Sequence, residues 1–148
     1  MILQPTSRDS TSTSLDRQKM LKYLDAGLAG NSSRFTRQAA LSWLTSFPGD
    51  LEVNLAYARA LVQEKRFVHA APVVQKVLRA DPEFAEALLM KSRCFYFLGD
   101  HDSSFYYARK YLEIDSDDPT AQADMAYYYF YKHESDSALK YWTLPLKN

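Results

Sequence analysis

The feature that most constrains this chain is an internal repeat with a period of about 34 residues. Residues 85–118 have a counterpart on either side, one beginning at Leu51 and the other at Pro119. A fixed period of this length indicates an array of similar supersecondary units. A single unit of this kind cannot bury its apolar face alone, so we expect the units to stack around a continuous core.

Side-chain size repeats with the same period. Small residues stand at the eighth and twentieth positions of each unit, and large residues stand at the eleventh and twenty-eighth. Packing of the ridges of one helix into the grooves of another needs this pairing of small with large, so each unit is expected to be a pair of helices. The residues at these four positions are Ala58, Ser92 and Ala126; Ala70, Ser104 and Ala138; Leu61, Phe95 and Tyr129; and Leu78, Leu112 and Leu146.

Turn and cap residues divide the chain into eight expected helices. Ser14 is expected to cap the first helix. Asp81-Pro82 and Asp118-Pro119 each combine an acidic N-cap with a proline suited to the first helical position, and they are expected to open the fifth and seventh helices. The helices are expected at 15–29, 34–46, 51–64 and up to about 80, with four more between Asp81 and the C-terminus. The expected fold is all-α.

Prolines and glycine set further boundaries. Pro72 lies inside the fourth helical stretch, so that helix either begins near His69 or is kinked. Gly99 separates the fifth helix from the sixth. Ser135 is expected to cap the eighth helix, and Pro145 is expected to end it.

These positions resemble the tetratricopeptide repeat, a helix–turn–helix unit with the signature W-x2-L-G-x2-Y, then A-x3-F, then P. The unit at 119–148 matches best, with Met125-Ala126-x2-Tyr129 followed by Ala138-x3-Trp142. The resemblance implies a right-handed α-solenoid of antiparallel helix pairs that acts as a protein-binding scaffold.

Several residues depart from the family signature. Asn54 and Gln122 occupy a position that is apolar in the family, Lys91 replaces leucine, and Ser116 replaces proline. The first two helices form a degenerate unit, in which Tyr23-x2-Ala26-Gly27 and Ala39-x3-Trp43 echo the signature at an offset shorter than the full period. An atypical terminal unit is expected in a repeat array, because it has a neighbour on one side only.

The expected domain organisation follows from these units. Residues 1–13 are polar and are expected to form a disordered N-terminal arm. Residues 14–148 are expected to form one helical-repeat domain. It comprises the degenerate unit 15–50 and the units 51–84, 85–118 and 119–148.

Composition excludes several classes of partner. Lysine plus arginine and aspartate plus glutamate both number 18, so the formal net charge of zero gives no electrostatic case for nucleic acid or an acidic membrane surface. No apolar run approaches the roughly 18 residues that a membrane span needs. The single cysteine, Cys94, cannot form an internal disulfide, which favours a reducing compartment. We therefore expect a soluble cytoplasmic protein.

The sequence predicts no enzyme, metal site or cofactor. His69, His101 and His133 fall at turns of three different units, too far apart to bind one ion. Cys94 lies on an apolar helix and is expected to be a buried, inert thiol. Motifs for phosphate loops, serine nucleophiles and helical zinc sites do not occur in the sequence.

Aromatic residues exceed what one helix can bury. Tyr127, Tyr128, Tyr129, Phe130 and Tyr131 are consecutive, and at about 100° per residue they surround the helix. Tyr129 belongs to the core by its position in the repeat. About half of the remaining excess is expected to pack against neighbouring helices, and the rest is expected to form a binding surface.

In the tetratricopeptide family, the first helix of each unit lines a concave groove that binds partner peptides. The resemblance therefore implies a groove suited to an apolar or amphipathic segment, with Arg59 and Arg93 able to clasp a carboxylate. The candidate partner-binding residues are Leu55, Arg59, Leu89, Met90, Arg93, Tyr96, Phe97, Tyr127, Phe130 and Tyr131.

One subtype of the family clamps acidic chaperone tails with lysine, asparagine and arginine at set positions. Those positions hold Leu55, Arg59, Met90, Thr120 and Asp124 in this chain. The chain is therefore not expected to bind chaperone tails.

The C-terminal end offers a second hypothesis. Tyr141, Trp142, Leu144 and Leu146 close the last helix, and no polar capping helix follows them. An uncapped end of a repeat array exposes apolar surface. Either the natural protein continues past Asn148, as an interaction or oligomerisation fragment of a larger regulatory protein, or two chains dock end to end as a homodimer. A regulatory or substrate-holding domain of an enzyme is a third possibility, which no residue supports.

Overall fold

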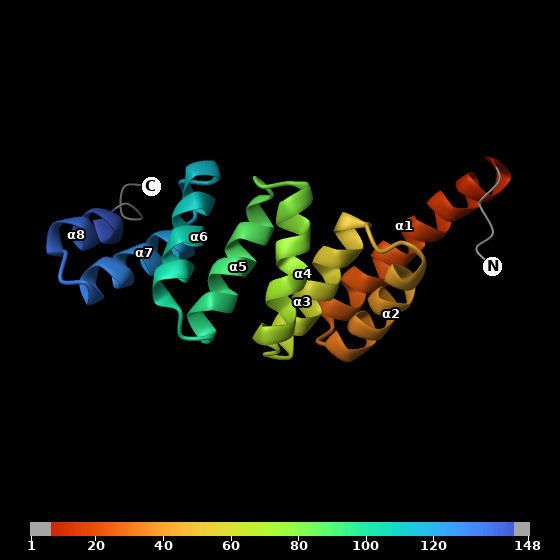
Figure 1. Ribbon diagram of the computed structural model, residues 1–148, viewed down its shortest axis with the longest axis horizontal. Coiled ribbons are helices and arrows are strands. Elements are labelled where there is room, and N and C mark those ends of the chain that lie inside the picture. The colour runs from red at the N-terminus through yellow and green to blue at the C-terminus, as the bar shows by residue number, and fades with distance from the viewer. Residues whose placement is uncertain (1–6, 144–148) are drawn as a thin grey trace. The chain divides into compact units, whose positions relative to one another are not determined.

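A computed structural model describes residues 7–143, and these form eight α-helices (Figure 1). The prediction of an all-α fold is confirmed. The helices are α1 (Ser7–Ala29), α2 (Ser33–Ser46), α3 (Leu51–Gln63), α4 (Phe67–Ala80), α5 (Ala85–Phe97), α6 (His101–Ile114), α7 (Pro119–Tyr131) and α8 (Ser135–Thr143). The chain divides between Glu64 and Lys65 into two compact units, so that α1–α3 belong to the first unit and α4–α8 to the second.

The repeat appears directly in the helix starts. Helices α3, α5 and α7 begin at equal intervals of one period, and so do α2, α4, α6 and α8. The turn inside each pair places one residue in the left-handed region at the same interval. These residues are Asn31 (φ 57°), Lys65 (φ 59°), Gly99 (φ 87°) and His133 (φ 60°). All four helix pairs therefore keep one register, including the first.

The shorter offset predicted for the first pair is wrong. Thr36 donates a hydrogen bond from Oγ1 to the Leu24 carbonyl at 3.2 Å, where Ser92 donates to the Ser104 carbonyl at 2.8 Å in a later pair. Both bonds join the eighth and twentieth positions, so the first pair uses the same contact point. Its register is obscured because Leu24 stands where the other units have a small residue. Gly27 compensates, since a Cβ at Gly27 would collide with the Thr36 hydroxyl.

A single carboxylate joins the three helices of the first unit. Asp50 caps α3 by accepting a hydrogen bond from the Val53 amide at 3.4 Å. It also accepts from Arg17 of α1 at 2.8 and 2.9 Å, and from the Trp43 indole of α2 at 3.0 Å. Burial acts to raise the pKa of Asp50, but the bonds from Arg17, Trp43 and the amide outweigh burial and hold the pKa below its usual value.

The same arrangement recurs two repeats later, in the second unit. The Tyr111 hydroxyl near the end of α6 donates to Asp118 at 2.7 Å, and Asp118 caps α7 through the Thr120 and Ala121 amides at 2.9 and 3.1 Å. The Tyr111 bond holds the pKa of Asp118 below its usual value, against the opposing effect of burial. Tyr111 and Trp43 therefore use one repeat position to fix the start of the next helix.

The junction between α4 and α5 differs from the sequence-based expectation. Helix α5 begins at Ala85 with Phe84 as its N-cap, so the prediction that Asp81-Pro82 opens this helix is wrong. The Asp81 amide instead bonds to Val77 at the end of α4, and its carbonyl accepts from Phe84 at 3.2 Å to form a turn. The corresponding prediction for Asp118-Pro119 is confirmed.

Two helix starts are also earlier than predicted. Helix α4 begins at Phe67, so the alternative of a start near His69 is wrong and Pro72 lies inside the helix; the other alternative, a kink, stays a prediction. Val68 is 67% exposed, so the carbonyl that the proline leaves unpaired can be hydrated. Helix α1 begins at Ser7, within the predicted disordered arm, since extending a formed helix costs little. Residues 1–6 of that arm lie outside the described residues, as does Pro145.

The polar departures from the family signature have structural partners. The Asn54 side-chain amide donates to the Pro48 carbonyl at 3.0 Å, and Gln122 donates to the Ser116 carbonyl two repeats later. Each amide therefore holds the turn that precedes its own helix. Lys91 is 6% exposed and donates from Nζ to the Ala71 carbonyl at 3.3 Å. Burial lowers the pKa of Lys91.

Replacing Asp50 with alanine should lower the free energy of unfolding by about 2 kcal/mol, because α3 loses its cap and two donors lose their acceptor. The folded-state pKa of Asp50 is depressed, so its contribution is present above the pKa of the unfolded chain and is lost as the pH falls through the folded value. Urea unfolding of the wild-type protein and of Asp50→Ala, at neutral pH and in acid, measures whether their free energies of unfolding become equal as the pH falls. Asp117→Ala, in an exposed turn, is the control; equal stability of the two variants would contradict the role of Asp50.

Replacing Lys91 with leucine should raise the free energy of unfolding at pH 7 by about 1 kcal/mol, because the variant buries no ammonium group. The folded-state pKa of Lys91 is lowered, so the unfolded chain binds more protons between the two pKa values, and wild-type stability rises with pH there. The advantage of Lys91→Leu should therefore shrink as the pH approaches 10. Urea unfolding from pH 7 to 10 tests this, with Lys19→Leu on the exposed surface as control; an advantage that stays constant with pH would refute it.

Candidate functional site

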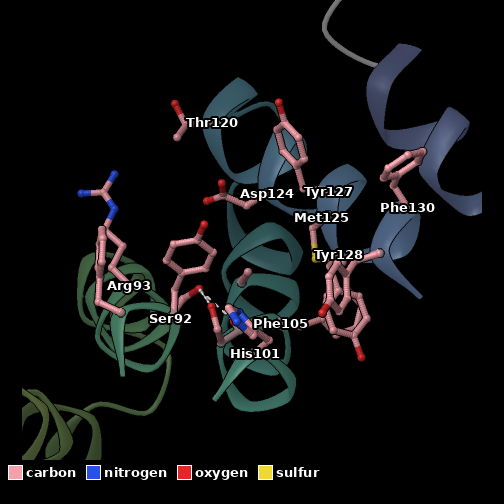
Figure 2. A pocket seen from close by; sticks show the side chains of 15 residues that line it. Ser92, Arg93, His101, Phe105, Thr120, Asp124, Met125, Tyr127, Tyr128 and Phe130 are labelled. Carbon is pink, nitrogen blue, oxygen red and sulfur yellow. Dashed lines mark hydrogen bonds between the residues drawn. The ribbon is translucent and has the colours of Figure 1, made fainter. Parts of the chain in front are cut away.

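A pocket of about 660 Å³ lies in the second unit, among α5, α6 and α7 (Figure 2). Aromatic rings make up much of its lining, and Arg93 and Asp124 are its charged residues of opposite sign. Each wall comes from a different helix.

Helix α5 supplies Arg93, Tyr96 and Phe97 to the first wall. Residues three and four positions apart share one face of a helix, so this spacing brings the guanidinium and both rings to the pocket. Tyr96 is 56% exposed and Phe97 is 61% exposed. Their rings lie 5.2 Å apart at 89°, so the wall offers both ring faces and ring edges to an occupant.

Helix α7 supplies the opposite wall, again through residues spaced so that they share one face of the helix. Asp124 is followed three and seven positions later by Tyr127 and Tyr131, and Phe130 borders the pocket beside them. Tyr127, Phe130 and Tyr131 are 66%, 61% and 78% exposed. The wall therefore combines one carboxylate with a row of exposed rings.

His101, the first residue of α6, bridges the two walls. Its ring lies 5.3 Å from the Tyr96 ring and 6.5 Å from the Tyr131 ring. The rings of α5 and α7 thus meet around the start of α6. The sequence predicted only that His101 falls at a turn between helices; in the structure it is exposed and belongs to this pocket.

Packed side chains form the base of the pocket. The Phe105 ring of α6 stacks on the Tyr128 ring of α7 at 3.6 Å, and Met125 of the same lining is fully buried. The Tyr128 hydroxyl donates to Asp102 at 2.9 Å, and Lys132 lies 3.2 Å from the same carboxylate. Burial, followed by the Asp102 bond, raises the pKa of Tyr128. These contacts hold α7 against α6.

Arg93 and Asp124 face the pocket from opposite walls (Figure 2). Asp124 is an exposed residue, yet partial removal of its carboxyl from water raises the pKa of this group. The positive charge of Arg93 opposes that shift, and the negative charge of Asp118 adds to it. Asp124 is therefore a carboxylate whose charge is only partly balanced.

The structure gathers six of the predicted groove residues at this pocket: Arg93, Tyr96, Phe97, Tyr127, Phe130 and Tyr131. Leu55 and Met90 are only 3% and 5% exposed, so they belong to the interior, and we remove them from the candidate surface. They were assigned to the surface because the position of a residue in the repeat does not show which side of its helix a neighbouring helix covers. Leu89 is half-buried in α5.

Arg59 lies in the first unit rather than at this pocket. Its Nη1 is 3.9 Å from Asp25 of α1, which is an ion pair within that unit. The inclusion of Arg59 in one groove with Arg93 stays a prediction.

The sequence-based list omitted Asp124, Thr120, His101, Phe105 and Tyr128 from the site. Asp124 carried a usable signal, because Tyr127, Tyr128 and Tyr131 follow it at helical spacing. Phe105 carried none, since its place at the base depends on how α6 meets α7.

The predicted end-to-end contact is described only in part. Tyr141 is half-buried, and its ring stacks on Tyr129 at 5.5 Å. The side chain of Trp142, together with Leu144 and Leu146, lies outside what the structure describes. Docking through this end stays a prediction.

Other kinds of site find little support in residues 7–143. No group of three histidine, cysteine or acidic side chains there could hold a metal ion. Cys94 is buried, and burial raises the pKa of its thiol. None of the helices described is both long enough and apolar enough to cross a bilayer.

Comparison with known proteins agrees with this fold. Residues 55–119 match the tetratricopeptide repeat family. Among solved structures, a crystal structure of MamA is 16% identical over 88% of this chain and 76% of that one, with a TM-score of 0.80. A double mutant of MamA RS-1 is 14% identical over 89% and 74%, with a TM-score of 0.81. No curated protein matches the sequence.

A third similar structure is MamA, residue 41 to the end, from Desulfovibrio magneticus RS-1. It is 14% identical over 88% of this chain and 73% of that one, with a TM-score of 0.79. At these identities the likeness shows the fold alone, and it confirms the predicted array of helix pairs. The resemblance to the tetratricopeptide repeat that the sequence predicted is confirmed over residues 55–119.

Proposed function

We propose that this chain is a protein–protein interaction scaffold that binds an apolar or amphipathic segment of a partner in the pocket among α5, α6 and α7. The observation that carries the proposal is the group of large rings left in contact with water around that pocket. Tyr96, Phe97, Tyr127, Phe130 and Tyr131 are between 56% and 78% exposed. A contiguous exposed apolar patch of this kind marks an interaction site.

The shape of the pocket favours a short peptide segment or a helix. A volume of about 660 Å³ is within the range of a ligand site and admits several side chains. A helical partner presents its side chains at three- and four-residue intervals, which matches rings arranged along two helices. Phe105 and Tyr128 are already stacked at the base, so binding does not have to order these two rings.

The chemistry of the site favours binding over catalysis. The pocket offers ring surface and two charged groups of opposite sign. Cys94 is buried with a raised thiol pKa, whereas a nucleophilic cysteine needs a lowered pKa and access to substrate. We therefore propose a non-catalytic role.

The wider groove implied by the repeat register would add Leu89 and Arg59. Arg59 already pairs with Asp25, so a partner carboxylate would compete with an existing ion pair. We therefore assign the main contact to the pocket of the second unit.

Peptides selected by display on the wild-type protein should lose at least tenfold in affinity for Tyr96→Ala and for Tyr127→Ala, because each change removes a pocket-lining ring. Tyr106→Ala and Tyr23→Ala are matched controls at exposed positions outside the pocket lining, and they should bind as wild type does. Fluorescence anisotropy measures the affinities, and circular dichroism checks that each variant keeps its helicity. Equal binding by the pocket variants and the controls would refute the proposed site.

A further inference from the structure

We infer that the pocket selects a partner segment that carries a basic side chain, lysine or arginine, among apolar neighbours. The inference rests on the proposed binding function and specifies the chemistry that this site recognises. The basic group would lie between Asp124 and the rings of Tyr96 and Tyr127, while the apolar neighbours cover the remaining rings.

The placement of Asp124 is the first argument. Asp124 and Tyr127 lie one turn apart on α7, so a carboxylate and an aromatic ring are offered to the same occupant. Figure 2 shows Asp124 directed from α7 into the space that Arg93 borders on the other side. A carboxylate next to aromatic rings recognises a cation, because the carboxylate pairs with it and the negative ring faces attract it.

The charge balance favours a cation over an anion. Arg93 interacts electrostatically with two carboxylates, Asp118 and Asp124. Arg93 and Asp124 line the pocket, and the negative charge of Asp118 acts on both from outside the lining. An acidic partner side chain would be repelled by these two negative charges, whereas a basic one would complete the charge balance.

Desolvation of Asp124 strengthens this choice. Removal from water raises the pKa of Asp124, and the nearby Arg93 charge only opposes that shift. A purely apolar segment would cover Asp124 further without compensating its charge, which carries a free-energy cost. A basic segment would instead supply a counter-charge to the group that needs one.

The second unit already uses aromatic rings to hold cations. Arg109 lies 5.7 Å from the Phe105 centroid, and Lys110 lies 4.9 Å from the Tyr106 centroid. Lys132 lies 5.7 Å from the Tyr128 centroid. Attraction between a cation and a ring acts at up to about 6 Å, so a basic side chain of a partner at Tyr96 or Tyr127 would repeat a contact that this unit makes internally.

Three synthetic amphipathic helical peptides test the inference. They share an apolar face and differ at one central position, which holds lysine, norleucine or glutamate. Norleucine keeps the aliphatic stem of lysine without its charge. Isothermal titration calorimetry measures the affinity of each peptide for the wild-type protein, for Asp124→Asn, and for the control Asp16→Asn, which alters an exposed carboxylate on α1.

The lysine peptide should bind wild-type protein roughly tenfold more tightly than the norleucine peptide, and the glutamate peptide should bind most weakly. Asp124→Asn should reduce the preference for lysine to about twofold or less, and Asp16→Asn should leave it unchanged. The Asn side chain keeps the shape of Asp, so the norleucine affinity should hold in all three proteins.

The outcomes separate the two proposals. If norleucine or glutamate binds as tightly as lysine, or if Asp124→Asn keeps the preference, the inference is overturned while peptide binding at the pocket stands. If none of the three peptides binds wild-type protein, both the inference and the proposed function are overturned.

Discussion

The bond from an aromatic side chain to the N-cap carboxylate of the next helix is the contact on which much of this structure depends. Trp43 donates to Asp50, and Tyr111 donates to Asp118 in the corresponding place two repeats later. Each carboxylate also receives backbone amides of the helix that it caps. One carboxylate therefore binds both a side chain near the end of one repeat and the first turn of the next. At the intervening junction, Val77 and Phe84 occupy these positions and replace the polar contact with apolar side chains.

The helix pairs were predictable because the repeat acts through side-chain size. Two helices can approach closely only if the residues between them are small, as Ala58, Ser92 and Ala126 are. A small residue repeated at one interval can be recognised in the sequence. The first pair was misaligned because Leu24 and Thr36 meet the same constraint with Gly27 and a hydrogen bond.

The two Asp-Pro pairs were treated as equivalent, although they occupy different places in the repeat. One period after Asp81 the chain reaches Asp115, and these two residues are the C-caps of α4 and α6. Asp118 comes later in its unit and is the N-cap of α7. An Asp-Pro pair therefore predicted the start of α7 correctly and the start of α5 wrongly.

The pocket was only partly predictable, since a repeat register identifies a face of a helix but not what covers it. Arg93, Tyr96 and Tyr127 were assigned to a surface and lie at the pocket, whereas Met90 was assigned to the same surface and is buried. Asp124 counted in the sequence only as evidence against chaperone tails. Its part in the pocket depends on how α5, α6 and α7 pack together, which no local sequence pattern describes.

The position of Asp118 at the first turn of α7 gives the pocket a link to proton concentration. The carboxylate that starts α7 also orients the helix that bears Asp124, Tyr127 and Tyr131. Its pKa is lowered in the folded chain, so the cap is strongest above the unfolded-state value and weakens as acid protonates it. Protonation of Asp118 removes the acceptor that holds the Tyr111 hydroxyl and the first amides of α7. The helix that carries one wall of the pocket is therefore anchored least firmly in acid.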